Sequence, residues 1–266
     1  MESTKLQVLL GKVISTAKDT GSWIRAEREN FSPEKVEIKG LNDLVSYVDK
    51  SAEQKIITEL NQHFPAGFIV EEGTLNHRST YNWIVDPLDG TTNFVHGIPC
   101  YSISIALEYN NEIILGVVYE VTRDECFYAV KGGGSYLNSG AIRVSKTKKL
   151  SDCLIATGFP IYNFTRIDPY LETLKKLMQQ THGIRRIGSA ATDLCYVACG
   201  RADAFFEYNL NPWDVAAGAL IVKEAGGTVT DFSGNNGWLH GKEIIATNGW
   251  VEKEFREALS LMNAKS

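Results

Sequence analysis

The chain has 266 residues, of which 44% are hydrophobic, so it has ample material for a folded core. Its formal net charge of -5 argues against a nucleic acid or an anionic membrane surface as the main partner. The apolar stretch from Leu6 to Ile14 is interrupted by Gly11 and Lys12, so it fits neither a signal peptide nor a membrane-spanning helix. We expect a cytoplasmic protein with no membrane partner and no nucleic-acid partner.

Cysteine and histidine usage narrows the chemistry further. The five cysteines are widely spread without a Cys-x-x-Cys pair, which predicts free thiols and no disulfide. The five histidines are scattered as well, so a zinc site is not expected. No linker, repeat or low-complexity tract divides the sequence, which indicates a single domain over residues 1–266.

The amino-terminal part predicts two helices and then a short strand. Apolar residues recur at helical spacing over residues 5–29, and again from residue 42 or 43 to residue 63. Lys39 lies between the two helices, either solvated or within reach of a phosphate, and the sequence by itself favours solvation. The apolar run 68–70 predicts a strand that leads into Glu71-Glu72.

The stretch Asp86-Pro87-Leu88-Asp89-Gly90-Thr91-Thr92-Asn93-Phe94 combines two carboxylates, a turn and several hydroxyl residues. The apolar run 82–85 before it predicts a buried strand, which Pro87 and Gly90 end with a turn. Pro87 restricts Asp86 to extended geometry and Asp89 returns from the far side of the turn, so both carboxylates can face one cation. The alternative is an Asx-rich turn whose acids bond their own backbone.

The residues after Gly90 are suited to bind an anion. Thr91, Thr92 and Asn93 are types that begin helices, and a helix amino terminus offers free N–H groups and a positive dipole to an anion, most simply a phosphate. Glu71 follows a neighbouring strand, so we expect it near the two aspartates at one sheet edge, where α/β folds commonly place their sites. Without such a partner, Glu71-Glu72 reads equally well as a charged turn.

The rest of the chain mixes strands and helices. Residues 101–136 predict an antiparallel meander, within which Gly132-Gly133-Gly134 lacks the lysine and hydroxyl residue of a P-loop and reads as a turn. Beyond it, predicted strands and helices alternate, which indicates an α/β or a layered α+β protein. The predicted strands lie at 154–156, 183–186 and 204–207, and the predicted helices at 169–180 and 189–199.

The segment from Trp213 to Gly227 predicts a helix with small residues packed closely on all sides, ended by Gly226-Gly227. Asp214 lies in its first turn, where the helix dipole favours a carboxylate, so a simple cap is one interpretation. An acid that begins an otherwise apolar helix is costly to bury unless it is paired, and a metal ion would pair it.

The acids together favour magnesium chemistry. Glu71, Asp86, Asp89 and Asp214 are hard oxygen donors, and Mg²⁺ usually binds through a few carboxylates and a substrate phosphate. Two or three such ions polarise a water and stabilise a leaving oxygen, so the implied reaction is hydrolysis of a phosphate monoester. The Asp-x-x-Asp spacing differs from the Asp-x-Asp of aspartyl-phosphate enzymes, so we expect water as the nucleophile and no covalent intermediate.

The sequence resembles the inositol monophosphatase family, and in particular its bacterial members. The resemblance rests on the 86–94 stretch, on Trp213-Asp214-Val215-Ala216-Ala217-Gly218 and on Glu224-Ala225-Gly226-Gly227, with Glu71-Glu72 and the 39–45 segment also matching. It covers almost the whole chain. It implies a layered αβαβα fold of α+β class, shared with fructose-1,6-bisphosphatases, a homodimer, and magnesium-dependent hydrolysis that lithium inhibits.

The resemblance also assigns the metal ligands and the groups around the phosphate. Glu71, Asp86 and the Leu88 carbonyl would hold the first ion, Asp86, Asp89 and Asp214 the second, and Glu71 would contribute to a weaker third. Thr91, hydrogen-bonded with Glu71, would orient the attacking water. The N–H groups of Gly90 and Thr91 would hold the phosphate, with Thr92 beside them.

On the substrate side, the resemblance places Asp89, Ala190 and Glu207 against the inositol hydroxyls, with Asp214 nearby and Gly188-Ser189 as the adjacent turn. The segment 158–163 resembles the bacterial enzymes and differs from the animal ones, which leaves the natural substrate open.

The leading hypothesis is a phosphatase acting on myo-inositol 1-phosphate. The same chemistry on fructose 1,6-bisphosphate, histidinol phosphate or an adenosine bisphosphate is the alternative enzyme, because a fold does not fix a substrate. A mainly regulatory binding protein on this fold is the alternative from another class, and the complete set of acids argues against it.

Overall fold

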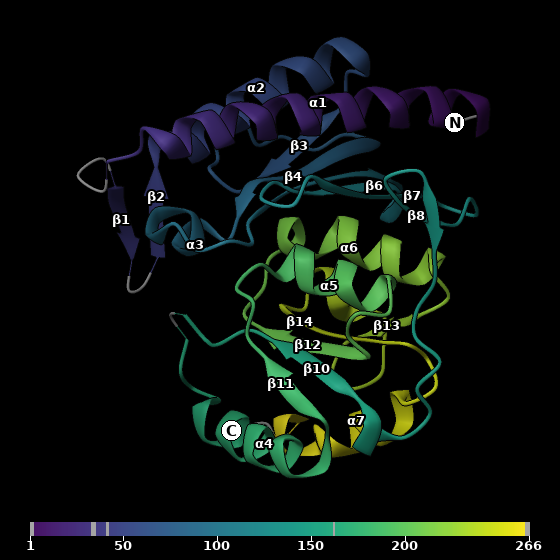
Figure 1. Cartoon of the computed structure of the whole chain (residues 1–266). Helices are drawn as coiled ribbons and strands as arrows, with labels where there is room; N and C mark the ends of the chain where they lie inside the picture. The colour runs from purple at the N-terminus through teal and green to yellow at the C-terminus, as the bar shows by residue number, and fades with distance from the viewer. Residues whose placement is uncertain (1–2, 33–35, 41–42, 162, 264–266) are drawn as a thin grey trace.

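The protein is built of five layers in the order helix, sheet, helix, sheet, helix (Figure 1). The computed structural model describes residues 3–32, 36–40, 43–161 and 163–263. The layered α+β arrangement implied by the resemblance is confirmed. The prediction of a single domain stays a prediction.

The first two layers are a helix pair and the sheet that it covers. Helices α1 (Ser3–Glu29) and α2 (Tyr47–His63) pack on one face of a seven-stranded sheet, with Val13, Ile56 and Trp83 fully buried between them. Strands β3 and β4 are parallel, and every later neighbour in the sheet is antiparallel, as the predicted meander requires. In spatial order the strands are β3 (Gly67–Val70), β4 (Tyr81–Asp89), β5 (Ser102–Tyr109), β6 (Glu112–Glu120), β7 (Glu125–Val130), β8 (Ser135–Leu137) and β9 (Gly140–Ile142).

The middle layer consists of α5 (Ala190–Ala198) and α6 (Pro212–Glu224), which lie between the two sheets (Figure 1). Residues 215–222 of α6 are all buried, as its apolar sequence predicted. Its backbone lies very close to β6, because a Cβ atom on Gly116 would come within 2.9 Å of the Ala217 carbonyl oxygen. A Cβ on Gly218 would come within 2.7 Å of Leu194 on α5. Small residues therefore hold α6 against both of its neighbours.

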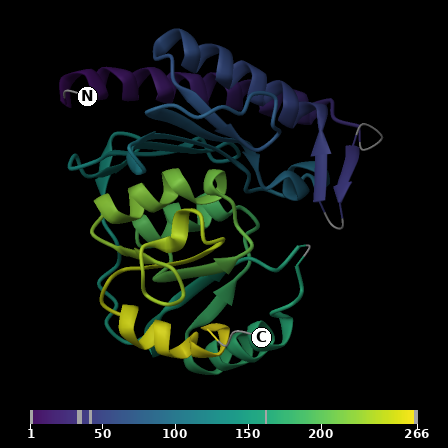
Figure 2. The ribbon, with the colours of Figure 1, turned by 180° about the vertical axis from the view of Figure 1, so that it is seen from behind.

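The last two layers are a five-stranded sheet and the helices on its far side (Figure 2). Helices α4 (Ile167–Gln180) and α7 (Glu252–Ala258) pack there around Phe206 and Phe255. In spatial order the strands are β11 (Gly183–Arg185), β10 (Leu154–Thr157), β12 (Ala204–Tyr208), β14 (Glu243–Thr247) and β13 (Thr228–Thr230). Short 3₁₀ turns occur at Leu150–Asp152, Gly237–Leu239 and Ser260–Asn263.

The start of the second helix differs from the prediction. The chain forms a hairpin of β1 (Val36–Gly40) and β2 (Asp43–Ser46), and α2 begins only at Tyr47. Ser46 caps the helix, because its hydroxyl accepts from the Val48 N–H while the Asp49 carboxylate accepts from the Ser46 N–H at 2.8 Å. This capping box fixes the helix start. The side chain of Lys39 lies outside the described residues.

Strand β4 also differs from the prediction, because Pro87 does not end it. The strand continues to Asp89, with an irregularity in its pairing to β5 between Asp86 and Asp89. A proline lacks the N–H that a regular ladder needs, so it is accommodated at this bulge. Helix α3 (Thr91–His96) then begins where the hydroxyl residues predicted a helix.

The prediction for the triple glycine is confirmed. The triple glycine is a turn, and the Glu224 carboxylate at the end of α6 accepts from the N–H groups of Gly132 and Gly134 at 2.8 and 2.9 Å. The five cysteines are free. Among the described helices, none combines the length and the apolar character that crossing a bilayer requires.

Candidate active site

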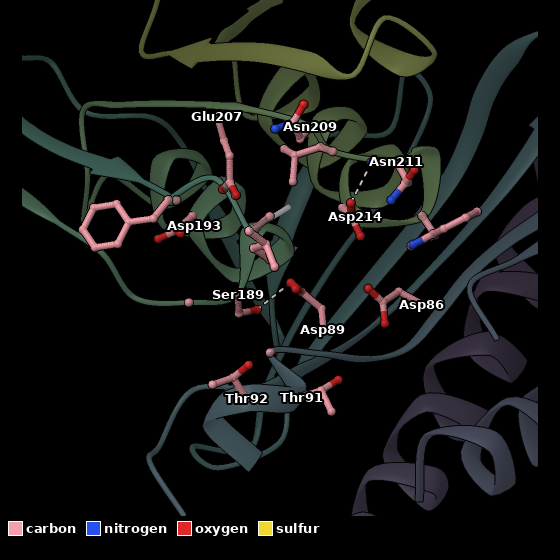
Figure 3. Close-up of a pocket in the computed structure, with 18 of the residues that line it drawn as sticks. Asp86, Asp89, Thr91, Thr92, Ser189, Asp193, Glu207, Asn209, Asn211 and Asp214 are labelled. Atoms are coloured by element: carbon pink, nitrogen blue, oxygen red, sulfur yellow. Dashed lines mark hydrogen bonds between the residues drawn. The ribbon is translucent and has the colours of Figure 1, made fainter. Parts of the chain in front are cut away.

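A pocket of about 170 Å³ opens where strand β4 of the first sheet and the following helix α3 meet α5, β12 and α6 (Figure 3). It gathers side chains from distant parts of the sequence. The predicted site residues that line it are Glu71, Asp86, Leu88, Asp89, Gly90, Thr91, Thr92, Ala190, Glu207 and Asp214. Every predicted site residue therefore lies at one pocket.

The bulge of β4 presents the two aspartates of the Asp-x-x-Asp stretch. Asp86 is 2% exposed, and its Oδ1 accepts the Leu88 N–H at 2.9 Å, which fixes the turn between the acids. Asp89 is joined to α5, since its Oδ2 accepts from the Ser189 hydroxyl and from the Ala191 N–H, both at 2.7 Å. Asp89 thus connects the first sheet to the middle layer of helices.

Asp214 approaches from the first turn of α6. Pro212 occupies a first-turn position where its missing N–H costs nothing, and Asp214 accepts the Asn211 N–H at 2.7 Å to complete a capping box. One carboxylate oxygen is used in this way. The cap interpretation and the metal interpretation of Asp214 are therefore compatible.

The electrostatics of this group of acids favour a bound cation. Burial raises the pKa of Asp86 well above its usual range, and the negative charges of Glu71, Asp89 and Asp214 raise it further. Burial likewise raises the pKa of Asp214, with the Asp89 charge next in importance. The pKa of Asp89 is raised by burial to about 6, against which the Ser189 hydroxyl acts. Like charges held together out of water are unfavourable unless a cation or a proton compensates them.

All of these acids are oxygen donors, so the set fits a hard divalent cation such as Mg²⁺. Among the residues that the structure describes, no three histidine, cysteine or acidic side chains already stand in the geometry of a coordinated ion. The fit therefore rests on the donor chemistry and on the mutual electrostatic influence of the acids.

The loop that carries Glu71 is held by a buried acid on α2. Glu53 is fully buried, and its carboxylate accepts from the N–H of Glu72 at 2.7 Å, from the N–H of Thr74 at 3.0 Å and from the Thr74 hydroxyl. These three bonds immobilise the turn directly after Glu71. The position of Glu71 thus depends on a residue outside the pocket.

Thr91 is oriented by the same helix. Its hydroxyl lies 2.8 Å from the Asp49 carboxylate and 3.0 Å from the Leu88 carbonyl oxygen. Burial raises the pKa of Asp49, and its hydrogen bonds with Ser46 and Thr91 oppose that change. Gly90 before it has φ 97°, and a Cβ there would come within 3.0 Å of the Gly188 carbonyl oxygen, so glycine is required.

The opposite side of the pocket carries Glu207 and Asp193 (Figure 3). Glu207 is pressed against Gly158, since a Cβ on that glycine would lie 2.0 Å from the Glu207 carboxyl carbon. Burial raises the pKa of Glu207 to about 8, and the Asp89 charge adds to this. Asp193, on α5, is 1% exposed.

The sequence reasoning missed Asp49, Glu53 and Asp193. Asp49 carried a usable signal, because Ser46 three residues before it is the pattern of a capping box. Glu53 and Asp193 carried none, since an acid on a helix is usually solvated and here the tertiary packing buries both side chains. The contact of Thr91 with Glu71 stays a prediction, and the hydrogen bond to Asp49 is an addition to it.

The comparisons with known proteins agree with the fold. The family model of the inositol monophosphatase family matches residues 5–261. The chain therefore belongs to the inositol monophosphatase family.

Its relatives carry two kinds of name. A protein of Rhizobium meliloti named inositol-1-monophosphatase is 45% identical, covering 94% of this chain and 96% of the relative. A protein of Neisseria meningitidis serogroup B named putative Nus factor SuhB is 43% identical, covering 94% of this chain and 97% of the relative. The solved structure of the extragenic suppressor protein suhB of Bartonella henselae has a TM-score of 0.90 at 42% identity, covering 95% of this chain and 98% of that one.

Proposed function

We propose that this protein is a magnesium-dependent phosphatase that hydrolyses myo-inositol 1-phosphate to inositol and phosphate, with water as the nucleophile and no covalent intermediate. The observation that carries the proposal is the group of acids around Asp86, where burial and the charges of Glu71, Asp89 and Asp214 raise the pKa of Asp86, at one end of a pocket whose other end carries the carboxyl groups of Glu207 and Asp193. The family and the Rhizobium relative's name support the substrate.

In this proposal two or three Mg²⁺ ions bind at the acidic end. Glu71, Asp86 and the Leu88 carbonyl would hold the first, Asp86, Asp89 and Asp214 the second, and Glu71 would contribute to a weaker third. When bound, the ions supply polarisation of the attacking water and of the phosphate, and stabilise the leaving oxygen. The complete donor set supports this assignment, and lithium sensitivity is proposed with it.

Thr91 and Asp49 position the nucleophile. Because the Thr91 hydroxyl donates its proton to Asp49 or to the Leu88 carbonyl, its lone pairs accept a hydrogen bond from the attacking water and fix its direction. As the water loses its proton to the threonine oxygen, the threonine proton passes to Asp49. The burial that raises the pKa of Asp49 makes it a better proton acceptor.

The remaining contacts orient the substrate. The N–H groups of Gly90 and Thr91, with Thr92 beside them, hold the phosphate, while Asp89, Ala190 and Glu207 face the hydroxyls of the sugar alcohol. The hydrogen bonds from Ser189 and Ala191 keep Asp89 fixed between the two ends of the pocket. The same chemistry on fructose 1,6-bisphosphate, histidinol phosphate or an adenosine bisphosphate is the alternative enzyme.

A second candidate function is regulatory, and it is favoured by the name Nus factor that the Neisseria relative carries. In that case the chain would act mainly through a macromolecular partner, and the expectation of no nucleic-acid partner would fail. The intact set of acids supports catalysis and does not argue against an additional regulatory role. A homodimer in the cytoplasm is proposed from the resemblance, and sedimentation would measure the oligomeric state.

Phosphate release from myo-inositol 1-phosphate tests the proposal, with Mg²⁺ present, with a chelator and with lithium added. We expect release that requires Mg²⁺, falls with lithium and is nearly abolished by Asp89→Asn. Asp152→Asn, an exposed aspartate distant from the pocket in sequence and not among its lining residues, serves as the control. Activity retained by Asp89→Asn would overturn the metal assignment. Cleavage of other monophosphates alone would overturn the substrate.

A further inference from the structure

Asp193 is a buried acid at the pocket that the catalytic assignment does not use. It lies in the first turns of α5, it is 1% exposed, and it is one of the pocket-lining residues. Its Oδ1 is buried and has no hydrogen-bond partner among the residues that the structure describes. An unpaired buried carboxylate oxygen costs free energy that a structural residue would not be expected to carry.

Helix capping does not account for this acid. The cap of α5 is Ser189, whose hydroxyl accepts from the Thr192 N–H at 3.3 Å, so the helix start is already satisfied. Asp193 comes four residues after the cap, beyond the positions where a carboxylate side chain reaches free N–H groups. Its carboxyl group is available for something outside the helix.

The surroundings of Asp193 identify the kind of group that it can meet. Three charged side chains that also line the pocket act on Asp193. The charges of Glu207 and Asp89 raise its pKa, Glu207 more than Asp89, and Arg186 opposes them. In Figure 3, Asp193 and Glu207 lie together on the side away from Asp86 and Asp214. A phosphate held at the acidic and cation-binding end would therefore direct the remainder of the substrate toward Asp193 and Glu207.

We propose that Asp193 is a specificity-determining residue, whose carboxyl group accepts a hydrogen bond from a substrate hydroxyl remote from the phosphate. With Glu207 it forms a carboxyl pair that selects polyol phosphates over alkyl phosphates of similar charge. Hydroxyl donors fit this pair because a carboxyl group accepts from them in either protonation state. The inference rests on the proposed function, and it names a determinant of substrate choice within it.

The test compares two substrates in one set of variants. The substrates are myo-inositol 1-phosphate and ethyl phosphate, which has the phosphate ester and no hydroxyls. Asp193→Ala removes the acceptor, and Asp193→Asn keeps an amide oxygen of the same size. Cys195→Ala, a buried truncation on the same helix and outside the pocket, is the matched control. Thermal unfolding of each variant reports whether it folds.

We expect Asp193→Ala to lower kcat/KM for inositol 1-phosphate by about 10- to 100-fold, mainly through KM, and to change ethyl phosphate hydrolysis less than about twofold. Asp193→Asn should recover most of this loss, and Cys195→Ala should affect both substrates alike. Equal losses on both substrates from Asp193→Ala would show a structural role and overturn the inference, as would no loss on inositol 1-phosphate.

Failure of the proposed function gives a different result. If the unaltered protein cleaves ethyl phosphate and sorbitol 6-phosphate but not inositol 1-phosphate, the named substrate is wrong. The inference then stands if Asp193→Ala lowers the preference for sorbitol 6-phosphate over ethyl phosphate, and it fails if that preference is unchanged. If the unaltered protein shows no preference for any polyol phosphate over ethyl phosphate, the inference is overturned.

Discussion

Gly158→Ala should reduce substrate recognition by displacing Glu207. A Cβ atom at this position would lie 2.0 Å from the Glu207 carboxyl carbon and Oε1 and 2.1 Å from Oε2, whereas an ordinary contact is at least 3.4 Å. The glycine backbone is fixed, because its carbonyl accepts the Tyr170 hydroxyl at 2.6 Å. The Glu207 carboxylate must therefore move by about 1.4 Å, which is enough to break a hydrogen bond to a bound hydroxyl.

A substrate hydroxyl left buried without its acceptor costs about 1–3 kcal/mol, so kcat/KM for myo-inositol 1-phosphate should fall about 5- to 150-fold. Steady-state phosphate release measures this. Glu207→Ala should cause a similar loss, and the double variant Gly158→Ala/Glu207→Ala should be no worse than Glu207→Ala alone, because both changes act on one contact. Normal kcat/KM in Gly158→Ala, or losses that multiply in the double variant, would refute the reasoning.

Three further predictions follow from the contacts around the pocket. Thr91→Val should lower kcat by at least about 100-fold with little change in KM, and adding Asp49→Asn should lower kcat little further because the two residues act together. Stopped assays at saturating substrate measure kcat, and losses that multiply in the double variant would contradict the prediction. Glu53→Gln should raise the Mg²⁺ concentration needed for half-maximal activity while kcat at saturating Mg²⁺ persists. Glu59→Gln, at an exposed position on the same helix, is the control. An unchanged Mg²⁺ requirement would show that the Glu71 loop does not depend on Glu53. The pKa of Glu207 is raised from 4.5 to about 8, so stability from this carboxyl is present below pH 4.5 and is lost as the pH rises toward 8. Without metal, Glu207→Gln should therefore be more stable than the unaltered protein at pH 7, by at most about 3 kcal/mol, and much less so at pH 5; urea unfolding at the two pH values measures this, and an equal difference at both would count against the linkage.

The sequence was informative where local pattern and chemistry coincide. Asp86 and Asp89 are three positions apart in the sequence, with Pro87 and Gly90 as turn residues, and this spacing predicted that the two acids face one site. Asp214 stood out because an acid that begins an apolar helix is unusual. In both cases, the neighbours along the chain carry the physical reason, so no knowledge of tertiary contacts was needed.

Long-range packing supplied what the sequence could not. Thr91 meets Asp49 across 42 positions, and nothing local pairs them. The hairpin of β1 and β2 was missed because Leu44 and Val45 also fit the helical pattern that continues into α2. Pro87 was expected to end β4, and only the pairing with β5 decides that the strand passes through it as a bulge.

The hydrogen bond from Ser189 to Asp89 spans 100 positions, so the two ends of the site are synthesised far apart in time. The nascent chain exposes Asp86 and Asp89 long before α5 and α6 exist to hold them. A ligand that needs both ends binds the completed protein and not its earlier fragments, so ligand binding draws the folding equilibrium toward the fully assembled layers. The pocket thus joins residues from both halves of the chain, and its occupancy requires that both halves are folded against each other.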